Sequence, residues 1–279
     1  MSGVPGIDVS RWQGEINWSR VGGAGYRFAV MRATIGNYYT DPRFYVNWDG
    51  AREAGLLISA YHVVAPEKPA DSQMDRFFDV LDGRSGDLPL VLDVELSRDV
   101  SPENITASVQ TCAEWIQSED GRNPVIYTAR WFWDRNLLSE PDWAQYDLWV
   151  AHYGVDTPSL PCGWDEWTIW QYSDHGQVPG IGAATDLNWF NGDYEELLDY
   201  AEGELDMGTM PLAGLKARVT VESLTVRSGP GMNYGAVGEL AEGDLVNVVS
   251  LSGDDIWVQV EPGKWAPFRS RGTRYMELE

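Results

Sequence analysis

The chain has 279 residues, with 43 Asp and Glu against 20 Lys and Arg and a formal net charge of −23 at pH 7. So acidic a protein repels phosphate backbones, and we expect no nucleic-acid partner. No run approaches the roughly 20 apolar residues of a membrane span, and the N-terminal MSGVPGIDVS lacks the basic and apolar regions of a secretory signal. We therefore expect neither a membrane span nor a secretory signal. The length suits one large and one small domain.

Short β-rich runs follow one another along the first two thirds of the chain. Strands are expected at 5–10, 28–34, 57–64, 88–96, 124–129, 147–153, 167–173 and 184–190. Helices are expected at 42–54 and 70–82, and a third begins at Ser101, an N-cap residue followed by proline. After Tyr127 the gaps shorten, so the last helices should be short or missing. This alternation predicts a parallel sheet in an α/β, TIM-like barrel with an incomplete helical ring, of the (β/α)5(β)3 type.

The run LPLVLDVEL at 88–96 ends by placing two carboxylates one residue apart. Residues i and i+2 of a strand share a face, so Asp93 and Glu95 should lie side by side, with about 6 to 7 Å between their Cα atoms. The run is apolar on both faces before them, which is typical of a buried parallel strand whose C-terminal end opens to ligands. We interpret the two acids as a paired-carboxylate site. The alternative is a strand end that merely faces water.

Two further acids stand at equivalent places. Asp8 lies near the end of the first expected strand, and Asp186 lies in the eighth. Because the first and last strands become neighbours when a barrel closes, four acids far apart in the sequence should meet at one mouth. The chain also has 14 Trp, and flat aromatic faces stack on sugar rings. Carboxylates beside aromatics point to a carbohydrate substrate, although most of the Trp side chains should belong to the core.

The composition changes after Tyr200. Residues 201–214 contain Gly, Pro and acid without periodicity, as in a linker, and from Leu215 short strand-like runs alternate with Gly-rich turns, as in a small all-β barrel. Charge is uneven too, with 13 Lys and Arg against 34 Asp and Glu before Leu215, and 7 against 9 from there on. We expect a catalytic barrel at 1–203, a linker at 204–214 and a small β domain at 215–279.

Several segments resemble those of a known family. GIDVSRWQGEINW, YTDPRF, SAYHV, LVLDVEL and TDLNWF resemble, in order and spacing, the motifs of glycoside hydrolase family 25, the lysozymes found in phage endolysins and bacterial autolysins. This resemblance covers roughly residues 4–200. LTVRSGPGMNYGAVGEL and GKWAPF likewise resemble a bacterial SH3-like cell-wall-binding domain. One motif departs: where the family commonly reads Lys-Ala-Thr-Glu-Gly, this chain has a cation changed to Arg32 and an acid lost at Ile35.

The resemblance implies a muramidase that cuts the β-1,4 bond between N-acetylmuramic acid and N-acetylglucosamine. Cleavage needs a proton donor for the leaving oxygen and a stabiliser for the charge that develops at the anomeric carbon. Glu95, longer and crowded by other carboxylates that raise its pKa, is our candidate general acid. The family implies that Asp93 orients the 2-acetamido group or stabilises the oxocarbenium-like charge, and both alternatives stay open. Asp8 and Asp186 would tune the pair and hold the sugar.

Other residues are weaker candidates. Side chains that could line the groove or orient the saccharide at its rim are Tyr61, Tyr127, Trp149, Gln171 and Arg32, and for the first four a place in the core is the alternative. The three His residues lack the spacing and Cys partners of a metal site, so neither a metal nor a cofactor is expected. Cys112 shares an apolar helical stripe with Ile105, Val109 and Ile116 and should be a buried free thiol, with a bond to Cys162 as the alternative.

Two rival functions stay open on sequence alone. One is a hydrolase of chitin or its oligosaccharides, and the other is an inactive wall-binding protein, which only Ile35 favours. The expected partner is peptidoglycan, its glycan and possibly its stem peptides, and we expect a monomer. The lack of a signal suits an endolysin that stays in the host cytoplasm until release, while a trimmed secreted autolysin at the cell wall would look the same. Because bacterial walls are anionic, the less acidic residues 215–279 should supply attachment.

Overall fold

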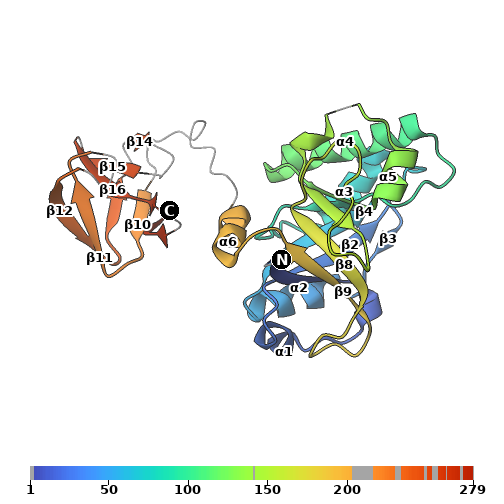
Figure 1. Cartoon of the computed structure of the whole chain (residues 1–279), viewed down its shortest axis with the longest axis horizontal. Coiled ribbons are helices and arrows are strands. Elements are labelled where there is room, and N and C mark those ends of the chain that lie inside the picture. Colours follow the sequence, from blue (N-terminus) through green and yellow to red (C-terminus); the bar gives the residue numbers. More distant parts are fainter. Residues whose placement is uncertain are drawn as a thin grey trace. The chain divides into compact units, whose positions relative to one another are not determined.

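The computed structural model describes residues 3–140, 142–202, 216–229, 234–247, 250–252, 257–261, 263–270 and 273–278. The chain divides into two compact units, Met1–Gly203 and Glu204–Glu279, whose elements are labelled in Figure 1. The expected linker, 204–214, begins directly after the first unit and lies outside the described residues. Within the described ranges, no helix is long and apolar enough to cross a membrane.

The first unit is a closed β barrel. Parallel neighbours follow in the order β1 (Val4–Val9), β2 (Phe28–Ile35), β4 (Leu57–Val63), β5 (Val91–Asp93), β6 (Val125–Thr128), β7 (Leu148–Ala151) and β8 (Ile169–Gly176). β9 (Thr185–Phe190) closes the barrel between β8 and β1, and the short β3 (Tyr39–Thr40) pairs only with the end of β2. Each expected run overlaps one barrel strand, so the predicted barrel is confirmed for the described residues.

The direction of β9 differs from the parallel sheet expected from the sequence. It runs antiparallel to both β8 and β1. Only residues 177–184 join β8 to β9, and a parallel crossover needs a connection of a dozen or more residues. The start of β9 therefore lies at the same end of the barrel as the carboxyl ends of the other strands. Asp186, its second residue, is placed at the mouth for this reason.

Helices lie outside the barrel (Figure 1). They are α1 (Trp18–Gly23), α2 (Phe44–Glu53), α3 (Ala70–Leu81), α4 (Pro102–Asp120), α5 (Arg130–Asn136) and α6 (Tyr194–Glu202), with the 3-10 turns η1 (Arg11–Gln13) and η2 (Trp143–Gln145). α2, α3 and α4 are the three expected helices, and α5 is short, as expected. On α3 one face has the i, i+3, i+4, i+7 spacing of a buried stripe, in which Met74, Phe77 and Leu81 are buried and Phe78 is partly buried against the core.

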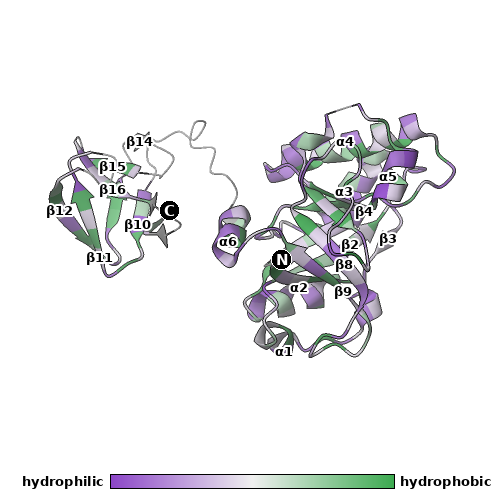
Figure 2. Cartoon of the chain, in the orientation of Figure 1, coloured by the Kyte–Doolittle hydropathy of each residue, from purple (hydrophilic) through white to green (hydrophobic). Residues whose placement is uncertain are grey.

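Strand residues alternate between two apolar cores. Side chains that point outward pack against the helices. Side chains that point inward fill the barrel, and they are Val4, Phe28, Val30, Leu88, Val91, Val125, Trp149, Ile169 and Phe190. In Figure 2 hydrophobic stretches, green, accordingly recur along the barrel strands between more polar ones. Gly6 makes room inside the barrel, because a Cβ there would lie 2.2 to 2.4 Å from the ring of Phe28. Above this packed floor the inward positions become polar, and they form the site described below.

The second unit is all β in its described residues. One sheet has the order β13 (Leu245–Asn247), β10 (Lys216–Val219), β19 (Met276–Leu278), and another the order β12 (Ala236–Ala241), β11 (Ser223–Arg227), β16 (Lys264–Pro267), β15 (Trp257–Glu261), β14 (Ser250–Ser252). A short hairpin joins β17 (Arg269–Ser270) to β18 (Thr273–Arg274). Val219, Leu224, Val226, Val258 and Phe268 are among the residues of its core. The small β domain expected from the sequence is confirmed as a fold.

Candidate active site

A pocket of about 210 Å³ opens at the mouth of the barrel. Its lining contains the four expected acids, Asp8, Asp93, Glu95 and Asp186, and four of the five expected groove residues, Tyr61, Tyr127, Trp149 and Gln171. Tyr153 and Val91 complete the lining. These residues come from β1, β4 to β9 and the segments just beyond them, so the closure of the barrel is what brings them together. Arg32, the fifth expected groove residue, is not part of this lining.

Asp93 and Glu95 differ in their surroundings. Asp93 ends β5 and is only 7% exposed, whereas Glu95, two residues further, is exposed at the mouth. Val94 between them points the other way, into the outer core, so the two acids share the inner face as predicted. Burial, then the charges of Glu95 and Asp8, raise the pKa of Asp93 well above its usual value. Loss of surrounding water and the charge of Asp8 raise the pKa of Glu95.

One oxygen of the Asp93 carboxyl group has no hydrogen-bond partner. This atom, Oδ1, is buried, and no donor reaches it among the described residues. A buried carboxylate oxygen normally accepts at least one hydrogen bond, and leaving it without one costs free energy. Asp93 lines the pocket, so this unpaired acceptor is a position for a donor from a bound molecule.

Asp8 and Asp186 form a second carboxyl pair, between neighbouring strands. They are register partners on β1 and β9, and a hydrogen bond joins their side chains. Burial raises the pKa of Asp8, while its hydrogen bonds to Asn188, Gln171 and Asp186 oppose that rise. Burial and the charge of Asp8 raise the pKa of Asp186 to about 8. Near neutral pH the proton of the pair is thus on Asp186, which donates to ionised Asp8.

A hydrogen-bond network holds Asp8 in place. Oδ2 of Asp8 accepts from Gln171 Nε2 and from Asn188 Nδ2, both at 2.9 Å. Gln171 Oε1 in turn accepts from the hydroxyls of Tyr127, at 2.8 Å, and Tyr153, at 2.6 Å. Because its oxygen accepts two bonds, the amide group of Gln171 can only direct its N–H groups toward Asp8. Gln171 is therefore an orienting residue in this structure, and its side chain is 3% exposed.

Trp149 belongs to both the pocket and the barrel core. It is 2% exposed, and its Nε1 donates to Asn188 Oδ1 at 2.9 Å. Its ring packs edge-on against Tyr127, with centroids 5.0 Å apart. The sequence left open whether Trp149 lines the groove or belongs to the core. It does both, because its indole forms part of the pocket wall from a buried position. A sugar could touch its edge but would not find an exposed face to stack on.

Two residues of the site were not expected from the sequence. Asn188 donates a hydrogen bond to Asp8 itself. Tyr153 donates one to Gln171, the residue that orients Asp8. Asn188 stands two residues after Asp186 on the same strand, and Tyr153 stands four residues after Trp149, so the period of two along a strand was an available signal for both. The sequence interpretation selected the carboxylates and missed this amide and this hydroxyl group, which hold Asp8 in place through hydrogen bonds.

Arg32 lies beside the pocket and is tied to Asp41. Its Nε and Nη2 both contact Asp41 Oδ2 at 2.9 Å, and the two side chains are 12% and 1% exposed. The positive charge of Arg32 lowers the pKa of Asp8, of Asp93 and of Glu95, against the raising effect of burial. Arg32 thus offsets part of the repulsion among the acids of the mouth. Its partner Asp41 was not among the expected site residues.

The remaining candidates are placed as follows. Cys112 is buried and Cys162 exposed, and both are free thiols in the part of the chain that the structure describes. Across the described ranges, no group of three or more His, Cys, Asp or Glu side chains has the arrangement of metal ligands. His62 is buried between Thr34 and Gln73, and burial lowers its pKa to about 4.

Comparison with known proteins agrees with this geometry. Residues 7–181 match the family described as Glycosyl hydrolases family 25, and residues 222–272 match the one described as Bacterial SH3 domain. Lysozyme M1 of Streptomyces globisporus is 39% identical over 72% of this chain and 72% of its own. The N,O-diacetylmuramidase of Chalaropsis is 31% identical over 72% of this chain and all of its own.

A solved structure shows the same fold. The bacterial lysozyme from Streptomyces coelicolor superposes with a TM-score of 0.67 at 36% identity, covering 72% of this chain and 98% of that one. The matched family model spans more than half of the chain and includes the positions of Asp8, Asp93 and Glu95. The chain is a member of glycosyl hydrolases family 25.

Proposed function

We propose that the protein is a muramidase that hydrolyses the β-1,4 bond between N-acetylmuramic acid and N-acetylglucosamine in bacterial peptidoglycan. The observation that carries this is the position of Glu95, exposed at the mouth of a pocket that it shares with three other acids, where loss of surrounding water and the charge of buried Asp8 raise its pKa. The lysozyme and muramidase names of the relatives at 39% and 31% identity supply the substrate class. The acid set is complete, which weighs against an inactive wall-binding protein.

Glu95 is the proton donor in this proposal. Cleavage requires a carboxyl group that still holds its proton near neutral pH and can reach the leaving oxygen. Asp93 ends β5 and is buried, whereas Glu95, two residues beyond it, is exposed. The raised pKa of Glu95 keeps the proton available there.

Asp93 is the partner that responds to the substrate. Its buried, unpaired Oδ1 is the place for the N–H of a 2-acetamido group. A new donor at this oxygen favours the ionised form of Asp93 and so lowers its pKa. Asp93 and Glu95 repel each other when both are charged, and ionisation of Asp93 then strengthens the hold of Glu95 on its proton. Substrate binding would thus place the proton of the pair on the general acid, next to the bond that breaks.

The test is digestion of purified peptidoglycan by the native chain and by Glu95→Gln, with mass spectrometry of the fragments. New reducing ends on N-acetylmuramic acid, absent with Glu95→Gln, are the expected result. Chitin serves as a second substrate, because cleavage of chitin in preference to peptidoglycan would assign the rival hydrolase activity. Binding of peptidoglycan without cleavage would point to the inactive wall-binding protein.

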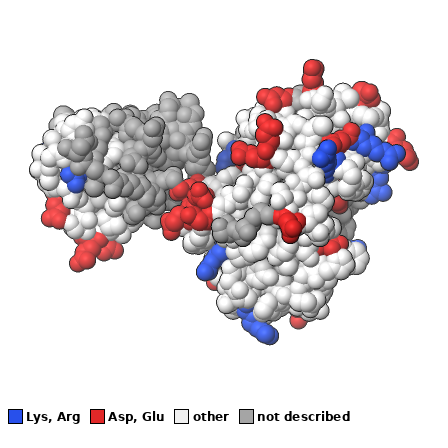
Figure 3. Space-filling model, in the orientation of Figure 1, with Lys and Arg blue, Asp and Glu red and all other residues white. Residues whose placement is uncertain are grey.

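The second unit is proposed to attach the enzyme to the wall. Its residues match a bacterial SH3 domain, and from Leu215 on the chain carries 7 Lys and Arg against 9 Asp and Glu, whereas the preceding part has 13 against 34. Figure 3 shows separate clusters of acidic side chains, with fewer basic ones among them, on an otherwise uncharged face. Deleting residues 205–279 should weaken binding to whole cells while sparing hydrolysis of soluble fragments. Equal loss of both would contradict the attachment role.

We also propose that the protein acts as a monomer at the cell wall. It would reach the wall by release from an infected cell or by secretion. The pocket forms entirely within the first unit of the chain. Activity per enzyme molecule should therefore be independent of enzyme concentration, and light scattering at working concentration should give the mass of one chain, 31.2 kDa.

A further inference from the structure

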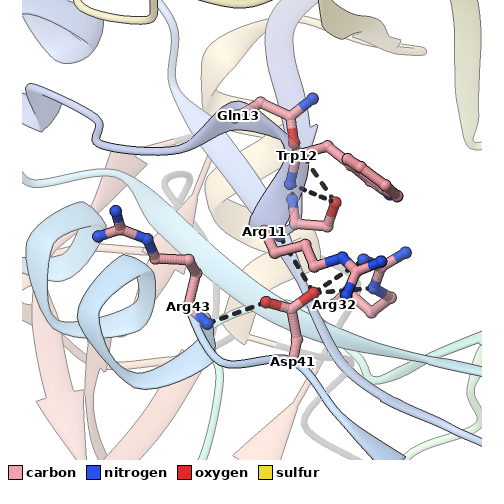
Figure 4. A network of polar contacts seen from close by, with 7 residues as sticks. Arg11, Trp12, Gln13, Arg32, Asp41 and Arg43 are labelled. Atoms are coloured by element: carbon pink, nitrogen blue, oxygen red, sulfur yellow. Dashed lines mark hydrogen bonds and ion pairs between the residues drawn. The ribbon is translucent and has the colours of Figure 1, made fainter.

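The rim beside the pocket has an arginine that the mechanism above does not use. Arg11 begins η1, three residues beyond Asp8 and thus about 10 Å from it along the chain. Its backbone N–H donates to Asp41 Oδ2 at 3.1 Å, the oxygen that also contacts the guanidinium of Arg32. The backbone N–H of Arg43 donates to the other oxygen of Asp41 at 2.9 Å, and Figure 4 shows these contacts. Asp41 therefore fixes the backbone of Arg11 independently of the Arg11 side chain.

The Arg11 side chain is held by aromatic rings. Its Cζ lies 4.4 Å from the ring centroid of Trp12 and 5.4 Å from that of Tyr39. The Cζ of Arg32 lies 5.6 Å from the same Tyr39 ring. Trp12 is 67% exposed, so this stack is at the surface. A guanidinium stacked on rings keeps its N–H groups available for other acceptors, and it is more ordered than a free surface arginine.

Positive charge exceeds negative charge at this place. The carboxylate of Asp41 forms an ion pair with Arg32. The carboxylate of Glu15 lies 4.0 Å from the guanidinium of Arg43. No carboxylate pairs with the guanidinium of Arg11 in the part of the chain that the structure describes. In a protein with 43 acidic and 20 basic residues, an ordered and unpaired arginine beside the substrate pocket is best explained by an anionic group that arrives with the ligand.

We propose that Arg11 forms an outer subsite that binds a carboxylate carried by a muramic acid residue of the glycan, with the exposed face of Trp12 against the sugar. Arginine suits this role because its planar fork matches the geometry of a carboxylate. The carboxylate belongs either to the lactyl group of a bare muramic acid or to the stem peptide attached to it. Chitin has neither group, so the subsite also favours peptidoglycan over chitin. This inference rests on the proposed function.

The test measures binding in the full chain with Glu95→Gln, in which fragments should stay intact. Calorimetry would compare this protein with versions that also have Arg11→Gln, Arg11→Lys or Arg27→Gln. Arg27 is the matched control, because it is exposed and its Cζ lies 5.3 Å from the ring of Tyr194, yet it precedes β2 at the opposite end of the barrel. The ligands are soluble muramic acid fragments with stem peptides, the same fragments without peptides, and both after conversion of their carboxylates to methylamides.

Arg11→Gln should raise the Kd for the carboxylate fragments roughly 5- to 10-fold and leave the Kd for the methylamides unchanged. Arg11→Lys should recover part of the loss, and Arg27→Gln should change nothing. Whether the effect appears with the peptide-bearing or the peptide-free fragments identifies the source of the carboxylate. Equal effects on carboxylates and methylamides, no effect at all, or no binding of any fragment would overturn the subsite. Failure of the native chain to cleave peptidoglycan would instead count against the proposed function.

Discussion

Asp8 and Asp186 face each other across the antiparallel strands β1 and β9 and share one proton between their carboxyl groups. The pair exists because the last strand reverses direction, which brings the start of β9 to the end of β1. Asp8 also accepts two amide N–H groups, so its negative charge is fixed in position. A proton on Asp186 then limits the charge at the mouth, where Asp93 and Glu95 already repel each other.

The proton on Asp186 makes stability depend on pH. The pKa of Asp186 is raised from 3.8 to about 8 in the folded chain, so the folded state binds this proton more tightly than the unfolded state does. The contribution of Asp186 to the free energy of unfolding is therefore fully present below about pH 4 and falls as pH rises from about 4 to about 8. Asp186→Asn should show a smaller fall in Tm between pH 5 and pH 8 than the native chain. Asp49→Asn, at an exposed acid of α2, is the control, and equal slopes in all three proteins would refute the shared proton.

Asn188 should matter for the rate more than for substrate binding. Asn188→Ala removes one of the two amide donors of Asp8 and the acceptor of the Trp149 N–H. The pKa of Asp8 should rise further, and its carboxylate should lose its fixed orientation. We expect kcat to fall about 10- to 100-fold, with little change in KM. Asn191→Ala, at an exposed residue just beyond β9 whose side chain donates to the carbonyl of Trp167, should leave both constants unchanged. A change in KM alone would show that Asn188 contacts the substrate instead.

The barrel and its four acids could be predicted from the sequence because strand periodicity is a local property. Asp93 and Glu95 share a face by the period of two, and Asp8 and Asp186 join them once the barrel closes, so all four line one pocket. The run 88–96 was expected as one long strand, but β5 spans only Val91–Asp93. Its apolar residues predict burial correctly, while the extent of strand pairing depends on where the neighbouring strands β4 and β6 end.

Pairings between distant polar residues could not be predicted in the same way. The bond between Arg32 and Asp41 depends on the turn between β2 and α2, and that of Asn188 to Asp8 spans 180 positions of the chain. No periodicity in a single sequence specifies such contacts. The direction of β9 was within reach, because the eight-residue connection is too short for a parallel crossover.

The ion pair of Arg32 and Asp41 should be strongly coupled. Arg32→Gln would leave the carboxylate of Asp41, which is 1% exposed, without its charged partner. We expect the free energy of unfolding to fall by about 2 to 4 kcal/mol, because a buried charge that loses its partner is costly. The double variant Arg32→Gln/Asp41→Asn should lose less than the sum of the single variants by about 1 to 3 kcal/mol. Urea denaturation of the four proteins gives the coupling. Arg43→Gln, which removes a partner of the exposed Glu15, should change stability by less than about 0.5 kcal/mol, and additive single effects would contradict the coupling.

The two cysteines should react very differently. Burial raises the pKa of Cys112 to about 12 and shields its thiol, whereas Cys162 is exposed. Native protein should therefore release one equivalent of chromophore with a disulfide reagent at pH 8, and two after denaturation. Cys162→Ser should abolish the native reaction, and Cys112→Ala should not. No reaction in denatured, unreduced protein would indicate a disulfide between the two residues.

The floor of the barrel should tolerate no side chain at position 6. A Cβ on Gly6 would lie 2.2 to 2.4 Å from three ring atoms of Phe28, which is fully buried among the inward side chains. The ring has no free space to move into, so Gly6→Ala must displace β1 or force Phe28 from its rotamer, and we expect a loss of about 2 to 3 kcal/mol in the free energy of unfolding. Gly182→Ala is the matched control, since a Cβ there meets nothing within 4 Å. Because β1 carries Asp8, the strand shift should also lower kcat. The double variant Gly6→Ala/Phe28→Leu should recover part of the lost stability and part of the lost kcat. A Gly6→Ala protein as stable as Gly182→Ala would show that the barrel interior is less tightly packed than this structure requires.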